Sequence, residues 1–87
     1  MKTIRIYSKS YCPYCVEAKR LLDQLEIPYE TIDVTDDAGT LIEISAKSGM
    51  RTVPQIWADD ECLGGYSDLL ALCKSGELDG RIRKILS

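Results

Sequence analysis

The sequence predicts an α/β fold whose elements follow one another in the order β-α-β-α-β-β-α. Two observations predict it. Short runs of β-branched and aromatic residues alternate with segments whose apolar residues recur at helical spacing. Prolines and glycines lie at the borders between these segments, where they end helices and strands. The chain has 87 residues, enough for one domain with a modest core, and we expect that domain to span residues 1–87.

The first half of the chain predicts a β-α-β unit. Residues 3–7 and 29–34 are rich in β-branched and aromatic side chains and predict two strands. Between them, Pro13 suits the first turn of a helix because its missing N–H would have no partner there. Pro28 is expected to set the end of that helix, and the unit should be a right-handed parallel crossover. The expected apolar face of the helix consists of Tyr14, Ala18, Leu21, Leu22 and Leu25.

Two further strands are expected in the second half, at residues 54–58 and 61–64. Asp59 and Asp60 lie between them and predict a hairpin turn, so that these two strands should be antiparallel. The four strands together would form one mixed sheet.

Along the chain, one helix is expected before this hairpin and two are expected after it. Residues 35–37 offer caps for the helix before it, Gly49 should end that helix, and its buried side is expected to carry Leu41, Ile42 and Ile44. Ser67 is expected to cap the helix after the hairpin, and residues 78–86 predict a last short helix. The apolar residues of the helix that Ser67 would cap are Leu69, Leu70, Leu72 and Cys73.

The composition excludes several classes of function. The formal net charge is −3 and charges of both signs are mixed along the chain, so no basic stripe is available for nucleic acid. No apolar run approaches the roughly 20 residues of a membrane span, and the first residues do not resemble a signal peptide. We therefore expect a cytoplasmic protein, whose four cysteines would not form a disulfide framework. The absence of histidine excludes Ser-His-Asp and Cys-His hydrolases and zinc sites that need imidazole.

Two of the cysteines form the motif Cys12-Pro-Tyr-Cys15, between a predicted strand and a predicted helix. In that context a C-x-x-C pair is typical of redox chemistry. Cys12 lies at the helix start, where free N–H groups and the helix dipole stabilise a thiolate, and Lys9 and Lys19 add positive charge nearby. Cys15 lies one turn further, so its sulfur can approach Cys12 and resolve a mixed disulfide.

Three motifs together resemble the dithiol glutaredoxins, in the same order and spacing over nearly the whole chain. The resemblance implies a thioredoxin fold, a four-stranded mixed sheet flanked by helices. It implies a monomeric oxidoreductase that reduces protein disulfides and glutathione mixed disulfides, with glutathione as co-substrate and no tightly bound cofactor. The motifs are Cys12-Pro13-Tyr14-Cys15, Thr52-Val53-Pro54-Gln55 and Gly64-Gly65-Tyr66-Ser67-Asp68.

The same resemblance assigns roles to individual residues. Cys12 would be the nucleophile and Cys15 the resolving thiol. Val53, held before a cis Pro54, would pair through its backbone with the cysteinyl unit of glutathione. The substrate-binding residues that the resemblance implies are Lys9, Tyr14, Thr52, Val53, Pro54, Gly65, Tyr66, Ser67 and Asp68.

The two ends of glutathione are assigned to different residues. Ser67 and Asp68 would take the γ-glutamyl end, because a helix start suits a carboxylate and a carboxylate side chain can accept from an ammonium. Thr52 and Arg51 are candidates for the glycyl end. Tyr66 departs from many relatives, which carry an extra cysteine at this place, so regulation through that cysteine is not available here.

Other functions remain open at this point. Thioredoxin-like reductants, fed by a flavoprotein, usually carry Trp before the first cysteine and Gly-Pro within the pair, whereas this chain has Tyr11 and Pro-Tyr. An iron–sulfur carrier, bridging a cluster between two subunits, is disfavoured in the family by the proline after Cys12. A third alternative is a non-catalytic thioredoxin-fold binding module, and the intact Cys12-Cys15 pair argues against it. A zinc site would have to recruit Cys62 and Cys73, which are not spaced as a second zinc knuckle and are expected to be catalytically silent.

Overall fold

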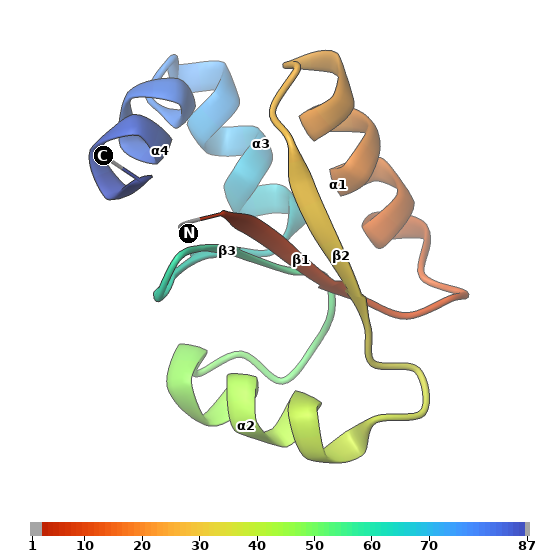
Figure 1. Cartoon of the computed structure of the whole chain (residues 1–87). Helices are drawn as coiled ribbons and strands as arrows, with labels where there is room; N and C mark the ends of the chain where they lie inside the picture. The colour runs from red at the N-terminus through yellow and green to blue at the C-terminus, as the bar shows by residue number, and fades with distance from the viewer. Residues whose placement is uncertain (1–2, 87) are drawn as a thin grey trace.

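A four-stranded mixed sheet organises the protein, as the computed structural model describes it for residues 3–86 (Figure 1). Its strands lie in the order β2-β1-β3-β4. β1 pairs in parallel with β2, whereas the pairs β1–β3 and β3–β4 are antiparallel. The fold class, the parallel β-α-β unit and the hairpin are thereby confirmed. The strands are β1 (Ile4–Ser8), β2 (Tyr29–Asp33), β3 (Gln55–Ala58) and β4 (Glu61–Gly64), each within one residue of the predicted bounds.

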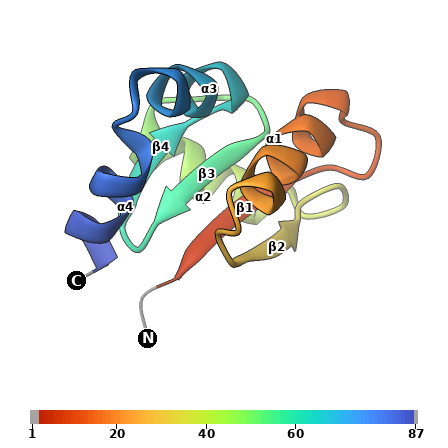
Figure 2. The ribbon, with the colours of Figure 1, turned by 90° about the horizontal axis from the view of Figure 1, so that it is seen from above.

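Helices cover both faces of the sheet unequally. Figure 1 shows three of them, α1 (Pro13–Gln24), α3 (Tyr66–Ser75) and α4 (Leu78–Leu86), on one face and α2 (Ala38–Ser48) alone on the other. Seen from above in Figure 2, α1 and α3 lie side by side over the sheet. None of the helices between residues 3 and 86 is long and apolar enough to cross a membrane.

Each face of the sheet has its own core. The larger lies under α1, α3 and α4 and includes completely buried Ile6, Leu22 and Leu69. The smaller lies under α2, where the rings of Tyr7 and Trp57 meet edge to face with centroids 6.4 Å apart. Burying these side chains away from water is the main stabilising term of the fold.

The helix ends follow local signals in the chain. The Asp37 carboxylate accepts a hydrogen bond from the Thr40 N–H at 3.1 Å and so caps α2, which ends at Gly49 in the left-handed conformation, as predicted. α1 ends earlier than Pro28 requires, because its cap is Leu25 and the next residue, Glu26, has a φ of 57°.

Two predicted apolar faces need correction. Ile42 was expected to be buried with Leu41, but its side chain is 69% exposed. Neighbouring positions on a helix differ by about 100°, so the face of α2 that carries Leu41 and Ile44 turns Ile42 to the outside. On α1, Tyr14 and Leu25 are 66% and 41% exposed, because the buried stripe follows Cys15, Ala18 and Leu22 instead.

Candidate active site

The sulfur of Cys12 occupies the start of α1. Cys12 is the N-cap of this helix, and its Sγ accepts a hydrogen bond from the backbone N–H of Cys15 at 3.2 Å. On the other side the thiol donates to the Val53 carbonyl, with an Sγ–O distance of 3.8 Å. A negative charge on this sulfur is favoured by the free N–H groups and the dipole of the helix. Cys12 is only half-buried, so a substrate can reach it.

Cys15 differs from Cys12 in its exposure to water. Its side chain is 1% exposed. Burial, and next the hydrogen bond with Cys12, raise the pKa of the Cys15 thiol to about 12, although the Lys9 backbone and the Lys19 charge act in the opposite direction. The pair is therefore asymmetric, with an accessible sulfur held at a helix start and a buried neighbour that stays protonated at neutral pH.

A hollow of about 360 Å³ lies beside this pair. It is built by the first turn of α1, the segment before β3 and the first turn of α3. It brings together eight of the nine predicted glutathione-binding residues, whereas Lys9 and the further candidate Arg51 do not line it. The lining residues are Tyr14, Met50, Thr52, Val53, Pro54, Gly65, Tyr66, Ser67, Asp68 and Leu70.

Two of these residues were missed by the sequence analysis. Met50 lies outside the motif that begins at Thr52, and Leu70 was assigned to the apolar side of its helix. One signal could have found Leu70, since it lies three residues after Ser67 and thus on the same side of α3. No pattern in the chain marks Met50.

A cis peptide and a pair of aromatic rings form part of the wall of the hollow. The peptide bond between Val53 and Pro54 is cis, which confirms the prediction. The rings of Tyr14 and Tyr66, which both line the hollow, stack with centroids 6.1 Å apart.

The start of α3 differs from the predicted arrangement. The N-cap is Gly65, not Ser67, and the Asp68 carboxylate accepts a hydrogen bond from the Gly65 N–H at 3.0 Å. Gly64 makes room for this bond, since a Cβ there would overlap the Asp68 side chain, and its φ of 107° favours glycine. Because the helix begins at Tyr66, Ser67 falls inside its first turn, where it is exposed.

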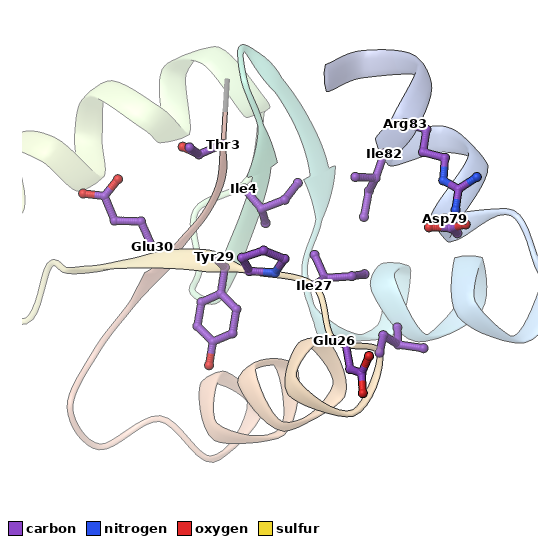
Figure 3. Close-up of a pocket in the computed structure, with 11 residues that line it drawn as sticks. Thr3, Ile4, Glu26, Ile27, Tyr29, Glu30, Asp79, Ile82 and Arg83 are labelled. Atoms are coloured by element: carbon purple, nitrogen blue, oxygen red, sulfur yellow. Dashed lines mark ion pairs between the residues drawn. The ribbon is translucent and has the colours of Figure 1, made fainter. Parts of the chain in front are cut away.

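A larger hollow of about 610 Å³ lies at the opposite end of α1, between the start of β2 and α4. Figure 3 shows that Ile4, Ile27 and Ile82 surround it, with the ion pair of Asp79 and Arg83 at its border, N–O distance 3.1 Å. The redox chemistry belongs to the smaller hollow, because Val53, which lines it, contacts the Cys12 sulfur through its carbonyl. Nowhere in residues 3–86 do three or more cysteine or carboxylate side chains gather in a way that could hold a metal ion.

Comparison with known proteins decides the family. The sequence profile of the family described as Glutaredoxin matches residues 4–63. The chain belongs to the glutaredoxin family. A glutaredoxin of Pseudomonas aeruginosa is 38% identical over 91% of this chain and 94% of its own length. Glutaredoxin 3 of Escherichia coli is 39% identical over 91% of this chain and 95% of its own.

Solved glutaredoxin structures have the same fold. A buckwheat glutaredoxin solved as a complex with glutathione has a TM-score of 0.88 at 28% identity, covering 97% of this chain and 79% of that one. A dithiolic glutaredoxin from Trypanosoma brucei brucei has a TM-score of 0.83 at 33% identity, covering 93% and 87%. The protein is therefore an enzyme with the thioredoxin fold, a thiol–disulfide oxidoreductase of the dithiol type.

Proposed function

We propose that this glutaredoxin reduces protein disulfides and glutathione mixed disulfides, with glutathione as the electron donor. The observation that carries the proposal is the position of the Cys12 sulfur. It lies at the start of α1, in contact with the Val53 carbonyl, and Val53 lines the neighbouring hollow. A thiol compound whose backbone pairs with Val53 would present its own sulfur to Cys12.

The chemistry of the hollow suits glutathione. This tripeptide carries two carboxylates and one ammonium group, so its ends need groups of different charge. The first turn of α3 offers free backbone N–H groups at Ser67 for the γ-glutamyl carboxylate, and Asp68 offers a carboxylate for the ammonium. Thr52 is proposed for the glycyl end, and Lys9, outside the hollow, for positive charge near it. The buckwheat glutaredoxin, solved as a complex with glutathione, supports this choice of ligand.

The reaction runs through mixed disulfides. The Cys12 thiolate attacks one sulfur of a substrate disulfide, forms a Cys12–substrate disulfide and releases the other sulfur as a thiolate. Cys15, once deprotonated, attacks the Cys12 sulfur and releases the substrate as a thiol, which leaves a Cys12–Cys15 disulfide. One glutathione then forms a mixed disulfide with Cys12 and frees Cys15. A second glutathione attacks the bound one, leaves as glutathione disulfide and restores the Cys12 thiolate.

A coupled assay tests this function. Purified protein is mixed with glutathione, glutathione reductase, NADPH and a mixed disulfide of glutathione and cysteine, and NADPH oxidation is followed. We expect turnover that saturates with the mixed disulfide and is absent in Cys12→Ser. A parallel reaction replaces glutathione and its reductase by thioredoxin reductase. Turnover in the second reaction alone would contradict the proposal and favour a thioredoxin-like reductant.

We also propose that the protein acts as a monomer in a reducing cytoplasm. The fold supports this because one chain supplies both cysteines and the whole hollow beside them. Light scattering of the reduced protein, with and without glutathione, checks the oligomeric state. A dimer that forms only with glutathione and carries a visible chromophore would instead support the iron–sulfur carrier.

A further inference from the structure

Gln55 is a buried amide with every hydrogen-bonding position occupied. It is the first residue of β3 and its side chain is 0% exposed. Its Oε1 accepts from the Ser48 hydroxyl at 3.0 Å and from the Trp57 indole at 3.4 Å. Its Nε2 donates to the Thr52 carbonyl at 3.2 Å and to the Ser45 hydroxyl at 3.4 Å. A primary amide has two donors and two acceptor positions, so these four bonds use all of them.

These bonds join three parts of the structure that meet behind the hollow. Ser45 and Ser48 belong to the last turns of α2, Trp57 belongs to β3, and Thr52 lies in the segment that leads to the cis peptide. The Ser48 hydroxyl also accepts from the Met50 N–H at 3.0 Å, which extends the network to a residue that lines the hollow. A buried polar network that is fully satisfied holds its members in one arrangement.

The bond to Thr52 sets the direction of a backbone donor. The Thr52 carbonyl and the Val53 N–H belong to the same peptide group, which is trans, since the single cis bond within residues 3–86 is Val53–Pro54. In a trans peptide the C=O and the N–H point in opposite directions. Because the Thr52 carbonyl points inward to Gln55, the Val53 N–H points away from the buried amide. The carbonyl of the same Val53 faces the Cys12 sulfur.

We propose that Gln55 is a positioning residue for the glutathione site, which it never touches. By holding the Thr52 carbonyl it fixes the plane of the Thr52–Val53 peptide, and so keeps the Val53 backbone ready to pair with the cysteinyl unit of glutathione. This inference rests on the proposed function. It predicts an effect on glutathione in particular, because a small thiol without a peptide backbone gains nothing from the orientation of Val53.

The test uses Gln55→Glu, which is nearly isosteric. In its ionised form the carboxylate keeps an acceptor for Ser48 and Trp57 but has no N–H to donate to Thr52, so the bond that orients the peptide is lost. Gln55→Met is measured beside it, because a buried carboxyl group that takes up a proton can again donate to Thr52. Both proteins carry Cys15→Ser, so that the reaction stops at the mixed disulfide of Cys12. The equilibrium constant for exchange of Cys12 with glutathione disulfide is measured by mass spectrometry, and again with 2-hydroxyethyl disulfide. Each exchange forms one Cys12 mixed disulfide and releases one thiol.

We expect the equilibrium constant for exchange with glutathione disulfide to fall about fivefold or more in Gln55→Glu, which is the effect expected from the loss of one hydrogen bond. The equilibrium constant for exchange with 2-hydroxyethyl disulfide should change less than about twofold. The rate of Cys12 alkylation by iodoacetamide should also stay within about twofold. Ile82→Val, a buried change on α4 that does not touch the hollow beside Cys12, is the control for a general loss of stability and should leave both constants unchanged.

If the equilibrium constants for the two disulfides fall equally, or if neither falls, the proposed role of Gln55 is overturned. If the parent Cys15→Ser protein shows no preference for glutathione over 2-hydroxyethyl disulfide, the proposed function fails with it. Should the buried carboxylate prevent folding, Gln55→Met removes the same bond with a side chain of similar length and must show the same glutathione-specific loss. Far-UV circular dichroism and urea unfolding report whether each variant is folded.

Discussion

The rings of Tyr14 and Tyr66 stack with their centroids 6.1 Å and their planes 26° apart. Tyr14 follows Cys12 by two residues at the start of α1, and Tyr66 is the first residue of α3. The pair therefore joins the two helices across the hollow beside the reactive sulfur. Since Tyr14 remains 66% exposed, the stack removes little surface from water, and its main effect is to hold one wall of the hollow in place.

This contact predicts non-additive effects in a double-mutant cycle. Tyr14→Ala and Tyr66→Ala should each raise the KM for the glutathione mixed disulfide, and the double variant should raise it hardly more than the stronger single one, because each ring is held by the other. The coupling energy in urea unfolding should be about 0.5 kcal/mol, as expected for a partly exposed aromatic pair. Independent, additive effects on KM would show that the two rings do not act as one wall.

Replacement of Cys12 and replacement of Cys15 should have different effects in two activity assays. Cys12→Ser should lose all activity, because the half-buried but accessible sulfur at the helix start attacks first. Cys15→Ser should lose the reduction of protein disulfides that need both thiols, yet still remove glutathione from a mixed disulfide, because free glutathione can take the resolving role. A Cys15→Ser protein that is inactive with the mixed disulfide, or an active Cys12→Ser protein, would reverse the assignment.

Burial of Cys15 predicts a specific loss of stability at alkaline pH. Its pKa is about 12 in the folded protein and about 8.5 in an unfolded chain. A pKa raised by folding means that the stability conferred by the buried thiol is complete below about pH 8.5 and declines as pH rises toward the folded value. The advantage of the wild type over Cys15→Ala, measured by urea unfolding with reductant present, should therefore shrink between about pH 8 and about pH 10.5. Burial also raises the pKa of Cys62, which is kept in both proteins. A constant difference across this range would contradict the prediction.

Asp68 has a structural and a proposed ligand role that two substitutions can separate. Asp68→Ala removes the acceptor for the Gly65 N–H and should cost about 1 kcal/mol of stability. Asp68→Asn keeps an acceptor there and should lose little stability, but without the charge it should raise the KM for the glutathione mixed disulfide about fivefold. Cys12 alkylation should be nearly unchanged in both. If Asp68→Asn has the KM of the wild type, the carboxylate does not bind the ammonium of glutathione.

The other two cysteines should be silent in catalysis. The Cys62 sulfur lies 4.0 Å from the Met50 sulfur, and Cys73 packs against the larger core. Replacing both with alanine should leave kcat/KM for the mixed disulfide within about twofold, at a cost of about 1–2 kcal/mol in stability for the lost packing. A folded double variant with a large loss of turnover would show that one of these thiols takes part in the reaction.

The elements of the fold could be predicted because their signals act over a few residues. Within a helix, Pro13 is tolerated only in the first turn. Asp37 caps the first turn of the helix that follows it, and Gly49 adopts the left-handed conformation that ends a helix. The errors arose where two local signals competed. Ser67 is a good cap by its type, yet Gly65 caps α3, because the carboxylate of Asp68 folds back onto the Gly65 N–H in the space left by Gly64.

The sequence by itself determined the order of the elements, the place of Cys12 at a helix start and, through three motifs, the family. Only the tertiary structure decided which side chains are buried and what they contact, since burial depends on segments that are distant in the chain. Cys15 is buried and Ile42 is exposed through the packing of α1 and α2 on opposite faces of the sheet. Gln55 follows Pro54 in a strand of apolar residues, and no pattern marks its four bonds. They exist because the end of α2, the segment at Thr52 and the indole of Trp57 converge on one buried amide, which must satisfy its polar groups within the protein.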